Sequence, residues 1–429
     1  MSKLVLSPSP NPLKGTIEVP GDKSISHRAV IFGSLAEGVT KVTHFLDGED
    51  CMRTVHAFQT MGVNIKREGD SLIIDGKGIA ALEEPDQPLY FGNSGTTSRL
   101  MIGLLAGLPF FTASWGDPSL SKRPMDRVVN PLRDMGAIID GREKGSKLPL
   151  SIRGTRLQSI DYTLPVKSAQ VKSAVLFAGL LADGVTKVRE LTQTRNHTEN
   201  MLKAFQADIT TDGNTTEITG RKALKATNIY VPGDISSAAF FIAAAAIVPE
   251  SQVVLKNVGL NGTRTGILDV LKKMGADMEV SNQKEVGGEM IGDLTVKHTE
   301  LQGVKIKGDI IPRLIDEIPI IALLATQAEG TTVIKDAEEL RVKETDRIAA
   351  VTEVLSSLGA DIEATEDGMV IKGRAKITGG EVSAYNDHRI AMMGAIASLI
   401  SEEEVTIDDD SSIAISYPNF FEDLNSVIN

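Results

Sequence analysis

A short pattern of residues recurs six times along this chain, about every 70 residues. The clearest copies are the two Val-Pro-Gly-Asp segments at 19–22 and 231–234, and each copy leads into an apolar stretch of small residues. A regular repeat predicts an array of similar structural units, because each copy must bury its apolar face against others. The six copies begin near Val19, Gly92, Pro165, Val231, Arg313 and Tyr385.

Each copy carries the signals of helices and short strands. The apolar stretches, such as 238–247 and 318–325, are opened by an Asp, Ser or Asn that is a good helix N-cap. Apolar residues at helical spacing indicate a second helix, as in 267–274 and 351–358, and short strands such as 369–371 follow. The second helix ends at a glycine, which we expect to adopt the left-handed conformation that ends many helices. These glycines are Gly62, Gly136, Gly275 and Gly359.

These signals predict an α/β fold whose unit is a strand and a helix, a second strand and helix, and one or two final strands. Three copies precede Gly233 and three follow it, which predicts two similar halves. We place the crossings between the halves at the two Val-Pro-Gly-Asp segments, since Pro-Gly pairs separate elements. The predicted domains are 21–233, and 1–20 together with 234–429. General recurrence of α/β packing is the alternative, but the copies share residue identities as well as polarity.

The composition limits the partners of such a protein. The net charge of −12 argues against nonspecific binding to nucleic acid or a membrane surface, so an anion site must be a local basic pocket. No apolar run is long enough to cross a bilayer, and the first residues lack the features of a signal or transit peptide, so we expect a cytoplasmic protein. The one cysteine, Cys51, is interpreted as structural, and the scattered histidines predict no metal site.

Two motifs place cations where an anion could bind. Lys23 and Arg28 lie at the start of the first apolar stretch, where cations oppose the helix dipole, so binding explains them better than a solvated first turn does. Arg123 precedes a proline, which holds the arginine extended and lets its guanidinium fork onto a carboxylate or phosphate.

Two later motifs add carboxylates and cations. The segment Arg-Val-Lys-Glu-Thr-Asp-Arg at 341–347 is predicted to lie at the start of a helix, with Lys343, Glu344 and Arg347 on one face. An ordinary surface ladder of ion pairs has the same pattern. Asp-His-Arg at 387–389 supplies another cation and a candidate proton carrier.

Together these motifs resemble those of the 5-enolpyruvylshikimate-3-phosphate synthase family, within the enolpyruvyl transferases. The resemblance extends over essentially the whole chain. It implies a fold of two inverse βα domains, each of three repeated βαβαββ-like units, with the active site in the interdomain cleft. The motifs that carry it are Gly-Asp-Lys-Ser-Ile-Ser-His-Arg at 21–28, Gly-Asn-Ser-Gly-Thr at 92–96, Ser-Lys-Arg-Pro-Met at 121–125, the segment at 341–347 and Asn-Asp-His-Arg at 386–389.

The resemblance implies a transferase of the shikimate pathway that moves the enolpyruvyl group of phosphoenolpyruvate to the 5-hydroxyl of shikimate 3-phosphate. It implies a monomer that is a target of glyphosate, with no cofactor. The residues implied to bind shikimate 3-phosphate are Lys23, Ser24, Arg28, Ser168, Gln170, Arg195, Asp316 and Lys343. Those implied to bind phosphoenolpyruvate are Lys23, Gly95, Arg123, Gln170, Arg347 and Arg389.

Three positions depart from common family patterns. Ala169 stands where many members have a second serine, so one phosphate contact is missing from the pattern. Thr-Arg-Asn-His at 194–197 resembles a subgroup that uses arginine in place of a tyrosine, which is why Arg195 is nominated. Residues 412–418 contain no lysine, although some members use one near this point.

The reaction needs proton transfers and charge balance, which carboxylates and cations can supply without a metal. As a hypothesis, Glu344 protonates the methylene carbon of phosphoenolpyruvate and later removes that proton, while Asp316 accepts the proton of the substrate hydroxyl. Lys23 assists the departing phosphate. A methyl group added at Gly95 is expected to crowd glyphosate more than phosphoenolpyruvate.

Two rival functions are weighed against this one. UDP-N-acetylglucosamine enolpyruvyl transferases share the fold, but they typically carry a catalytic cysteine on a loop in the first half of the chain, and residues 116–127 contain none. A noncatalytic anion-binding repeat module has no need to place acids beside cations at several helix starts. Phosphate release that depends on the acceptor substrate separates these functions.

Overall fold

The computed structural model describes residues 3–9 and 11–428. The chain divides into two compact units, each considered separately below. Unit 1 comprises Met1–Asp22 together with Pro232–Asn429, and unit 2 comprises Lys23–Val231. The domain bounds inferred from the sequence, 21–233 and 1–20 with 234–429, stay a prediction.

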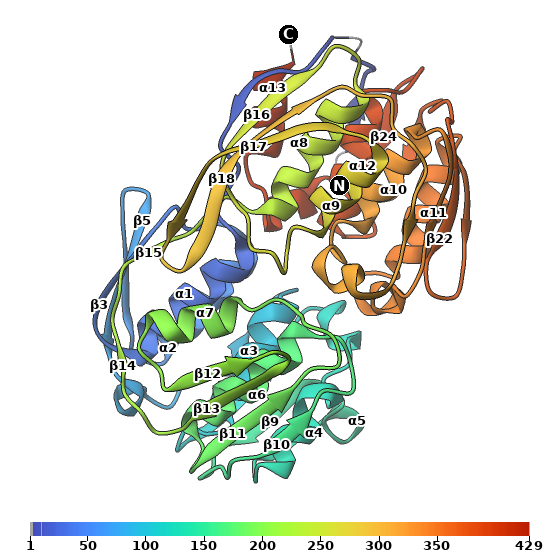
Figure 1. Cartoon of the computed structure of the whole chain (residues 1–429). Helices are drawn as coiled ribbons and strands as arrows, with labels where there is room; N and C mark the ends of the chain where they lie inside the picture. The colour runs from blue at the N-terminus through green and yellow to red at the C-terminus, as the bar shows by residue number, and fades with distance from the viewer. Residues whose placement is uncertain (1–2, 10, 429) are drawn as a thin grey trace. The chain divides into compact units, whose positions relative to one another are not determined.

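The described residues form six small sheets, which confirms the predicted α/β class (Figure 1). Three repeats are each built from one continuous stretch in the predicted order of strand, helix, strand, helix, strand, strand. In each of them the first two strands are parallel and the last two form an antiparallel hairpin. In unit 2, one comprises β6 (Leu89–Tyr90), α3 (Gly95–Leu105), β7 (Phe111–Trp115), α4 (Asp126–Asp134), β8 (Ile138–Gly141) and β9 (Lys147–Arg153), and another β10 (Asp161–Thr163), α6 (Ala169–Leu181), β11 (Val185–Arg189), α7 (His197–Ala204), β12 (Ile209–Asp212) and β13 (Thr215–Thr219). In unit 1, the third comprises β19 (Lys305–Ile306), α10 (Ile318–Gln327), β20 (Gly330–Ile334), α11 (Arg347–Ser357), β21 (Asp361–Ala364) and β22 (Met369–Gly373).

The other three sheets each include a strand from a distant part of the chain. In unit 2, β14 (Leu224–Lys225) and β15 (Ile229–Tyr230) pair in parallel with β3 (Ala36–Thr43). In unit 1, β2 (Lys14–Ile17) pairs in parallel with β16 (Gln252–Gly259), and Figure 1 shows this blue N-terminal strand beside β16. The remaining elements of these two repeats are α1 (Lys23–Leu35), α2 (Glu49–Thr60), β4 (Asn64–Glu68) and β5 (Ser71–Lys77), and then α8 (Ile235–Ile247), α9 (Gly266–Met274), β17 (Asp277–Val286) and β18 (Glu289–Lys297).

The last repeat is completed by the start of the chain. Its sheet contains β23 (Gly380–Val382), β24 (Val405–Ile407) and β1 (Leu4–Leu6), with β1 antiparallel to β24. Its helices are α12 (His388–Ser398) and α13 (Phe420–Val427). The sequence repeat did not predict these exchanges, because it specifies the local unit and not which distant segment pairs with it.

Each unit has its own apolar core around the helices that begin the repeats. All thirteen residues of α8 are buried, and their small side chains allow close packing against α10 and α12. Four second helices, α2, α4, α9 and α11, end as predicted, because each is followed by a glycine with positive φ. The values are 85° at Gly62, 99° at Gly136, 86° at Gly275 and 98° at Gly359.

The Pro-Gly-Asp parts of the two Val-Pro-Gly-Asp segments, 20–22 and 232–234, lie beside each other within unit 1 and are joined by backbone hydrogen bonds. The Asp22 amide donates to the Pro232 carbonyl at 2.7 Å, and the Asp234 amide donates to the Pro20 carbonyl at 2.9 Å. Gly21 and Gly233 form the antiparallel bridge between them. This reciprocal pairing fixes the places where the chain leaves unit 1 and returns to it.

No helix in the described parts of the chain combines the length and the hydropathy needed to span a bilayer.

Candidate functional site

The first helix of unit 2 carries three of the predicted binding residues. Lys23, the first residue of α1, forms an ion pair with Asp50 of α2. Arg28 is buried, and its guanidinium donates to Thr198 Oγ1 at 2.6 Å, to Ser173 Oγ at 2.9 Å and to the Ser24 carbonyl at 2.9 Å. Arg28 therefore links α1 to α6 and α7, while Lys23 remains partly exposed at the helix start.

The starts of α3 and α6 meet around a second group of predicted residues. Gln170 donates to Thr96 Oγ1 at 3.0 Å and accepts from Arg99 Nη1 at 2.6 Å. Gly95 opens α3, and a methyl group there would lie 3.0 Å from Arg99 Nη1 and 3.1 Å from Arg123 Nη1. The start of α3 thus lies close to two guanidinium groups, and a larger residue at position 95 would require them to shift by a few tenths of an ångström.

Arg123 has the extended backbone that its following proline predicts, with φ −73° and ψ 147°. Its guanidinium donates to Asn93 Oδ1, which precedes α3, and to Ser119 Oγ at 3.4 Å. Asn93 in turn donates to Asp117 at 2.8 Å. These contacts hold Arg123 beside Gly95, so the structure brings Gly95, Arg123 and Gln170 together. We call these three residues with Lys23, Ser24, Arg28 and Arg99 the first half-site.

Ser168 and Arg195 lie on segments fixed by buried groups of α6. Ser168 is the N-cap of α6, and its hydroxyl accepts from the Val171 amide. Arg195 lies between β11 and α7, and the segment before it is held by Glu190, which accepts from the Thr194 amide at 3.1 Å. Glu190 also pairs at 2.8 Å with Lys172, a fully buried residue of α6 that pairs at 2.7 Å with Glu199 as well.

The centre of the site residues in unit 1 is Arg347, whose side chain is 1% exposed. Its Nε and Nη2 donate to the two oxygens of Asp387 at 2.8 and 3.1 Å. Nη1 lies 3.3 Å from Asp316 Oδ1, and Nη2 lies 2.7 Å from Glu344 Oε2. Lys343 Nζ lies 3.1 Å from the same Asp316 oxygen. Arg347 therefore brings the two predicted proton-transfer residues, Asp316 and Glu344, onto one guanidinium.

The charge balance around Arg347 keeps its guanidinium firmly ionised. Burial by itself lowers the pKa of Arg347, but Asp387, Glu344 and Asp316 outweigh burial and raise the pKa above its usual value. A buried guanidinium is stable only when it is paired in this way. We call Asp316, Lys343, Glu344, Arg347, Asp387 and Arg389 the second half-site.

The expected helical placement of residues 341–347 was wrong. Residues Glu338–Val342 form a short 3₁₀ helix, and α11 begins only at Arg347, with Asp346 as its N-cap accepting from the Ala349 amide. Lys343 and Glu344 therefore lie in the connecting segment and not on a helix face. Lys343 nevertheless contacts Asp316, and Glu344 contacts Arg347. Both lie in the segment just before α11, whose N-cap is Asp346.

Arg389 follows the N-cap of α12, Asp387, and differs from Arg347 in its surroundings. Its Nη1 lies 3.8 Å from Glu317 Oε1, and its side chain is 11% exposed. Glu317 directly follows Asp316 and is fully buried. Arg389 is therefore a member of the second half-site that is not enclosed by carboxylates.

Several residues of these half-sites were not nominated from the sequence. Asp387 lay within the recognised motif at 386–389, and Arg99 lies one helical turn after Gly95, just beyond the motif at 92–96, so their positions were a usable signal. Asp50, which pairs with Lys23, gave no motif. Glu317 adjoins Asp316, but nothing in the sequence indicated that it would be buried.

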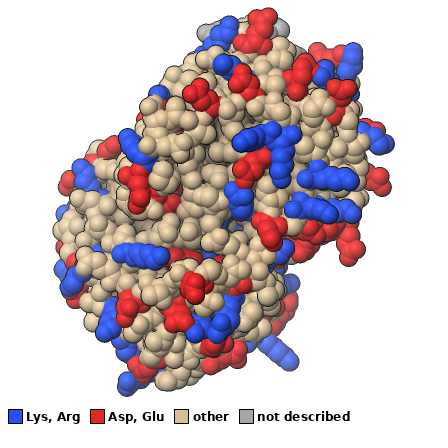
Figure 2. Space-filling model, viewed as in Figure 1, with Lys and Arg blue, Asp and Glu red and all other residues tan. Residues whose placement is uncertain are grey.

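Other features of the surface and interior carry no site residues. Among the residues that the structure describes, no group of three or more His, Cys, Asp or Glu side chains is arranged to hold a metal ion. Cys51 is buried, with its thiol 3.8 Å from the Lys23 carbonyl. Basic and acidic side chains are interspersed on the face drawn in Figure 2.

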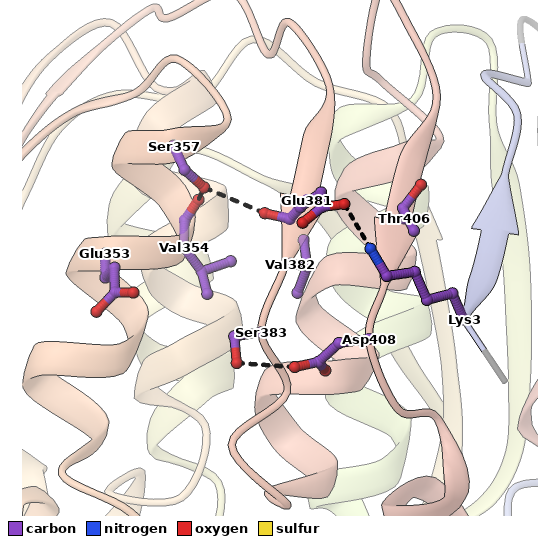
Figure 3. Close-up of a pocket in the computed structure, with 9 residues that line it drawn as sticks. All are labelled: Lys3, Glu353, Val354, Ser357, Glu381, Val382, Ser383, Thr406 and Asp408. Carbon is purple, nitrogen blue, oxygen red and sulfur yellow. Dashed lines mark hydrogen bonds and ion pairs between the residues drawn. The ribbon is translucent and has the colours of Figure 1, made fainter. Parts of the chain in front are cut away.

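A separate pocket in unit 1 lies between α11 and the sheet of β23 and β24 (Figure 3). It includes an ion pair between Lys3 and Glu381 at 2.6 Å and a hydrogen bond from Ser383 to Asp408 at 2.9 Å. None of the predicted site residues lines it.

The chain was compared with known proteins. The family model of EPSP synthase (3-phosphoshikimate 1-carboxyvinyltransferase) matches residues 8–424. The chain belongs to this family. A 3-phosphoshikimate 1-carboxyvinyltransferase of Oceanobacillus iheyensis is 61% identical over 428 residues, covering 100% of both chains. Family membership confirms the resemblance on which the site residues were nominated, while their individual roles stay predictions.

Solved structures agree with the family fold. The structure of EPSP synthase from Acinetobacter baumannii matches with a TM-score of 0.88 and 45% identity, covering 100% of this chain and 98% of that one. The enolpyruvyl transferase NikO from Streptomyces tendae matches with a TM-score of 0.80 at 18% identity, over 99% of this chain and 97% of its own. At this low identity the second match concerns the fold alone: the chain and NikO share one architecture.

Proposed function

We propose that this chain transfers the enolpyruvyl group of phosphoenolpyruvate to the 5-hydroxyl of shikimate 3-phosphate and releases phosphate. The observation that carries the chemistry is the pairing of Asp316 and Glu344 with the single guanidinium of Arg347. The reaction moves one proton away from the acceptor hydroxyl and one proton onto and off the methylene carbon. Two carboxylates held close together by one cation suit those two tasks.

The proposed proton transfers balance as follows. Glu344 gives a proton to the methylene carbon of phosphoenolpyruvate, and the hydroxyl oxygen of the acceptor attacks the neighbouring carbon as Asp316 takes the hydroxyl proton. Glu344 then removes a proton from the new methyl group, the enol double bond re-forms, and the carbon–oxygen bond to phosphate breaks. Lys23 neutralises the phosphate that leaves.

The proposed binding contacts divide between the two half-sites. Phosphoenolpyruvate is bound by Arg123, Arg347 and Arg389 through its carboxylate and phosphate, with Lys23, Gly95 and Gln170 beside it. Guanidinium groups suit this ligand because they match carboxylate and phosphate oxygens in a fork. Shikimate 3-phosphate contacts Lys23, Ser24, Arg28, Ser168, Gln170, Arg195, Asp316 and Lys343.

Arg347 is already paired with carboxylates before a substrate binds, so an incoming ligand must compete with them. In the structure all three of its guanidinium nitrogens face carboxylates. An incoming substrate carboxylate that approaches Nη2 shares this nitrogen with Glu344 or displaces Glu344 from it.

The decisive experiment measures phosphate release with phosphoenolpyruvate and shikimate 3-phosphate, omitting each in turn, with UDP-N-acetylglucosamine as a parallel acceptor. Release that requires shikimate 3-phosphate supports the proposal. Release only with the nucleotide sugar reassigns the acceptor, and no release with either acceptor favours a noncatalytic anion-binding protein.

We further propose that the protein acts as a monomer in the cytoplasm. The resemblance to the family supports the first statement, and the single cysteine, which is buried, requires no oxidising compartment. Light scattering at working concentration tests the first statement, and a dimeric mass contradicts it. Fractionation of cells that express the protein tests the second.

A further inference from the structure

The two arginines nominated for phosphoenolpyruvate in unit 1 are held in opposite ways. Arg347 is enclosed by Asp387, Asp316 and Glu344, so each of its three guanidinium nitrogens already faces a carboxylate. Among the described residues, Arg389 forms one ion pair, with Glu317 at the long distance of 3.8 Å. Arg389 therefore has donors available for an anion, and its direction depends on Glu317.

Glu317 is held more tightly than its single ion pair to Arg389 explains. It is fully buried at the N-cap position of α10, yet its side chain makes no capping bond. Its Oε1 accepts from the Ser236 hydroxyl, and its Oε2 has no hydrogen-bond partner among the described residues. Burying a carboxylate with an unsatisfied oxygen is unfavourable, so a role beyond packing is indicated.

Ser236 ties Glu317 to the paired segments where the chain leaves and re-enters unit 1. The Ser236 hydroxyl accepts from Arg264 Nη2 at 2.6 Å. The same guanidinium lies 3.1 Å from Asp234 and 3.2 Å from Asp22, the last residues of the two Val-Pro-Gly-Asp segments. Glu317 is therefore held by a buried series of polar contacts that runs through Ser236 and Arg264 to Asp22 and Asp234. The backbones on which these two aspartates lie are joined by hydrogen bonds.

We propose that Glu317 is a positioning residue for phosphoenolpyruvate, which orients Arg389 and is itself held in place by Ser236 and Arg264. The inference rests on the proposed function. Glu317 contacts neither substrate nor reacting atoms. An arginine side chain has several rotatable bonds, and fixing it before the ligand arrives removes part of the ordering cost of binding.

Simple electrostatics predicts the opposite effect, which makes the inference testable. Removing the negative charge of Glu317 leaves more net positive charge beside an anionic ligand, so attraction alone lowers the KM for phosphoenolpyruvate. If Glu317 instead positions Arg389, its removal raises the KM for phosphoenolpyruvate. The sign of the change therefore distinguishes the two explanations.

The experiment compares Glu317→Gln with the parent enzyme in steady-state kinetics. We expect the KM for phosphoenolpyruvate to rise about tenfold, with the KM for shikimate 3-phosphate and kcat changed by less than about threefold. An unchanged or lower KM for phosphoenolpyruvate overturns the inference. If the parent enzyme itself releases no phosphate, the proposed function fails and this inference with it; a normal parent with an unaffected variant defeats this inference alone.

Two further variants test the route of the effect. Ser236→Ala removes the hydroxyl between Glu317 and Arg264 while keeping both charges, and it should raise the same KM by a smaller factor. Adding Glu317→Gln to Arg389→Ala should change the KM for phosphoenolpyruvate little further, because the two residues act as a unit. Fully additive effects contradict positioning through Arg389.

A matched control replaces a buried carboxylate of the same unit that lies outside both half-sites. Asp293→Asn, on β18, removes a charge that contacts Lys256 at 2.7 Å. It should lower thermal stability without changing the KM for phosphoenolpyruvate. A comparable rise in that KM in the control shows that loss of any buried carboxylate suffices, and it overturns the assignment to Glu317.

Discussion

At the scale of single residues, the site depends on which side chains are already paired before a substrate arrives. Arg347 has three carboxylate partners, and Arg389 has one at a longer distance. The same residue type therefore serves two purposes at the starts of two helices of unit 1, α11 and α12. Arg347 holds Asp316, Glu344 and Asp387 close together, and Arg389 has N–H donors available for a ligand.

Replacing Glu344 with glutamine tests its proposed role in proton transfer. Glu344→Gln keeps the size of the side chain and a carbonyl oxygen for Arg347, but it cannot give up or accept the proton. We expect kcat to fall by about 10²–10⁴-fold, the usual contribution of a general acid or base. Affinity for shikimate 3-phosphate, measured by equilibrium binding, should stay within about threefold. Turnover near that of the parent removes Glu344 from the mechanism.

Replacing Arg347 tests its structural role separately from binding. Arg347→Met leaves Asp387, which is fully buried, without its main cation. We expect the free energy of unfolding to fall by about 3–5 kcal/mol, as when one partner of a buried ion pair is removed. The control is Arg341→Met, because Arg341 pairs with Asp346 at a site where both side chains are more than a third exposed. It should cost less than about 1 kcal/mol in denaturant unfolding, and equal losses in both variants contradict the argument.

Adding one methyl group at Gly95 tests the packing of the first half-site. In Gly95→Ala the new carbon would lie about 3 Å from guanidinium nitrogens of both Arg99 and Arg123. The two side chains must shift, so the KM for phosphoenolpyruvate should rise and inhibition by glyphosate should weaken more than substrate binding does. Inhibition constants and KM values measured on both proteins decide this. Inhibition equal to that of the parent contradicts the prediction.

At the scale of elements, one carboxylate supports two irregular strands. Asp293 on the central strand β18 accepts from the Asn257 amide at 3.0 Å and from Asn282 Nδ2 at 2.8 Å. Asn257 and Asn282 lie at the register shifts of β16 and β17, and both have a φ of 51°. Asparagine tolerates this left-handed conformation better than most residues, so the bulges and their shared acceptor fit together.

The stability contributed by Asp293 should depend on pH in a defined direction. Burial by itself raises the pKa of Asp293, but hydrogen bonds from Lys256, Asn282 and the Asn257 amide lower it to about 2. A lowered pKa means that the stabilisation is complete above the unfolded-state value near 4 and is lost as pH falls toward 2. Asp293→Asn should therefore be less stable than the parent by on the order of 1–2 kcal/mol at pH 6 and much closer to it at pH 2.5. A difference independent of pH, in denaturant unfolding at both values, contradicts this assignment.

The sequence predicted elements well where the signal was local. Glycine caps, buried small-residue helices and the extended backbone of Arg123 follow from neighbouring residues, and the structure confirms them. The placement of Lys343 and Glu344 was wrong because helical spacing does not reveal where a helix begins, and the N-cap of α11, Asp346, follows these two residues.

At the scale of the whole molecule, the repeat predicted the fold class but not the partners of several strands. Pairing of β2 with β16, or of β1 with β24, joins segments more than 200 residues apart, and no local pattern encodes such a pairing. The buried cations Lys172 and Arg264 were missed for a related reason. Charged residues usually mark a surface, and only the fold shows the carboxylates that compensate these two.

The strand exchange also sets an order of events during synthesis. Every strand of unit 2 pairs within Lys23–Val231, so its sheets can close as soon as that stretch has left the ribosome. Strands β1 and β2 precede unit 2 in the chain, but the partner of β2, β16, follows β2 by more than 200 residues, and the partner of β1, β24, lies later still. At translation rates of about 5–20 residues per second, β2 waits unpaired for roughly 10–50 seconds. Strand β2 is therefore made before all of unit 2 but pairs only after it, and during that interval its unpaired backbone is open to a chaperone or a protease.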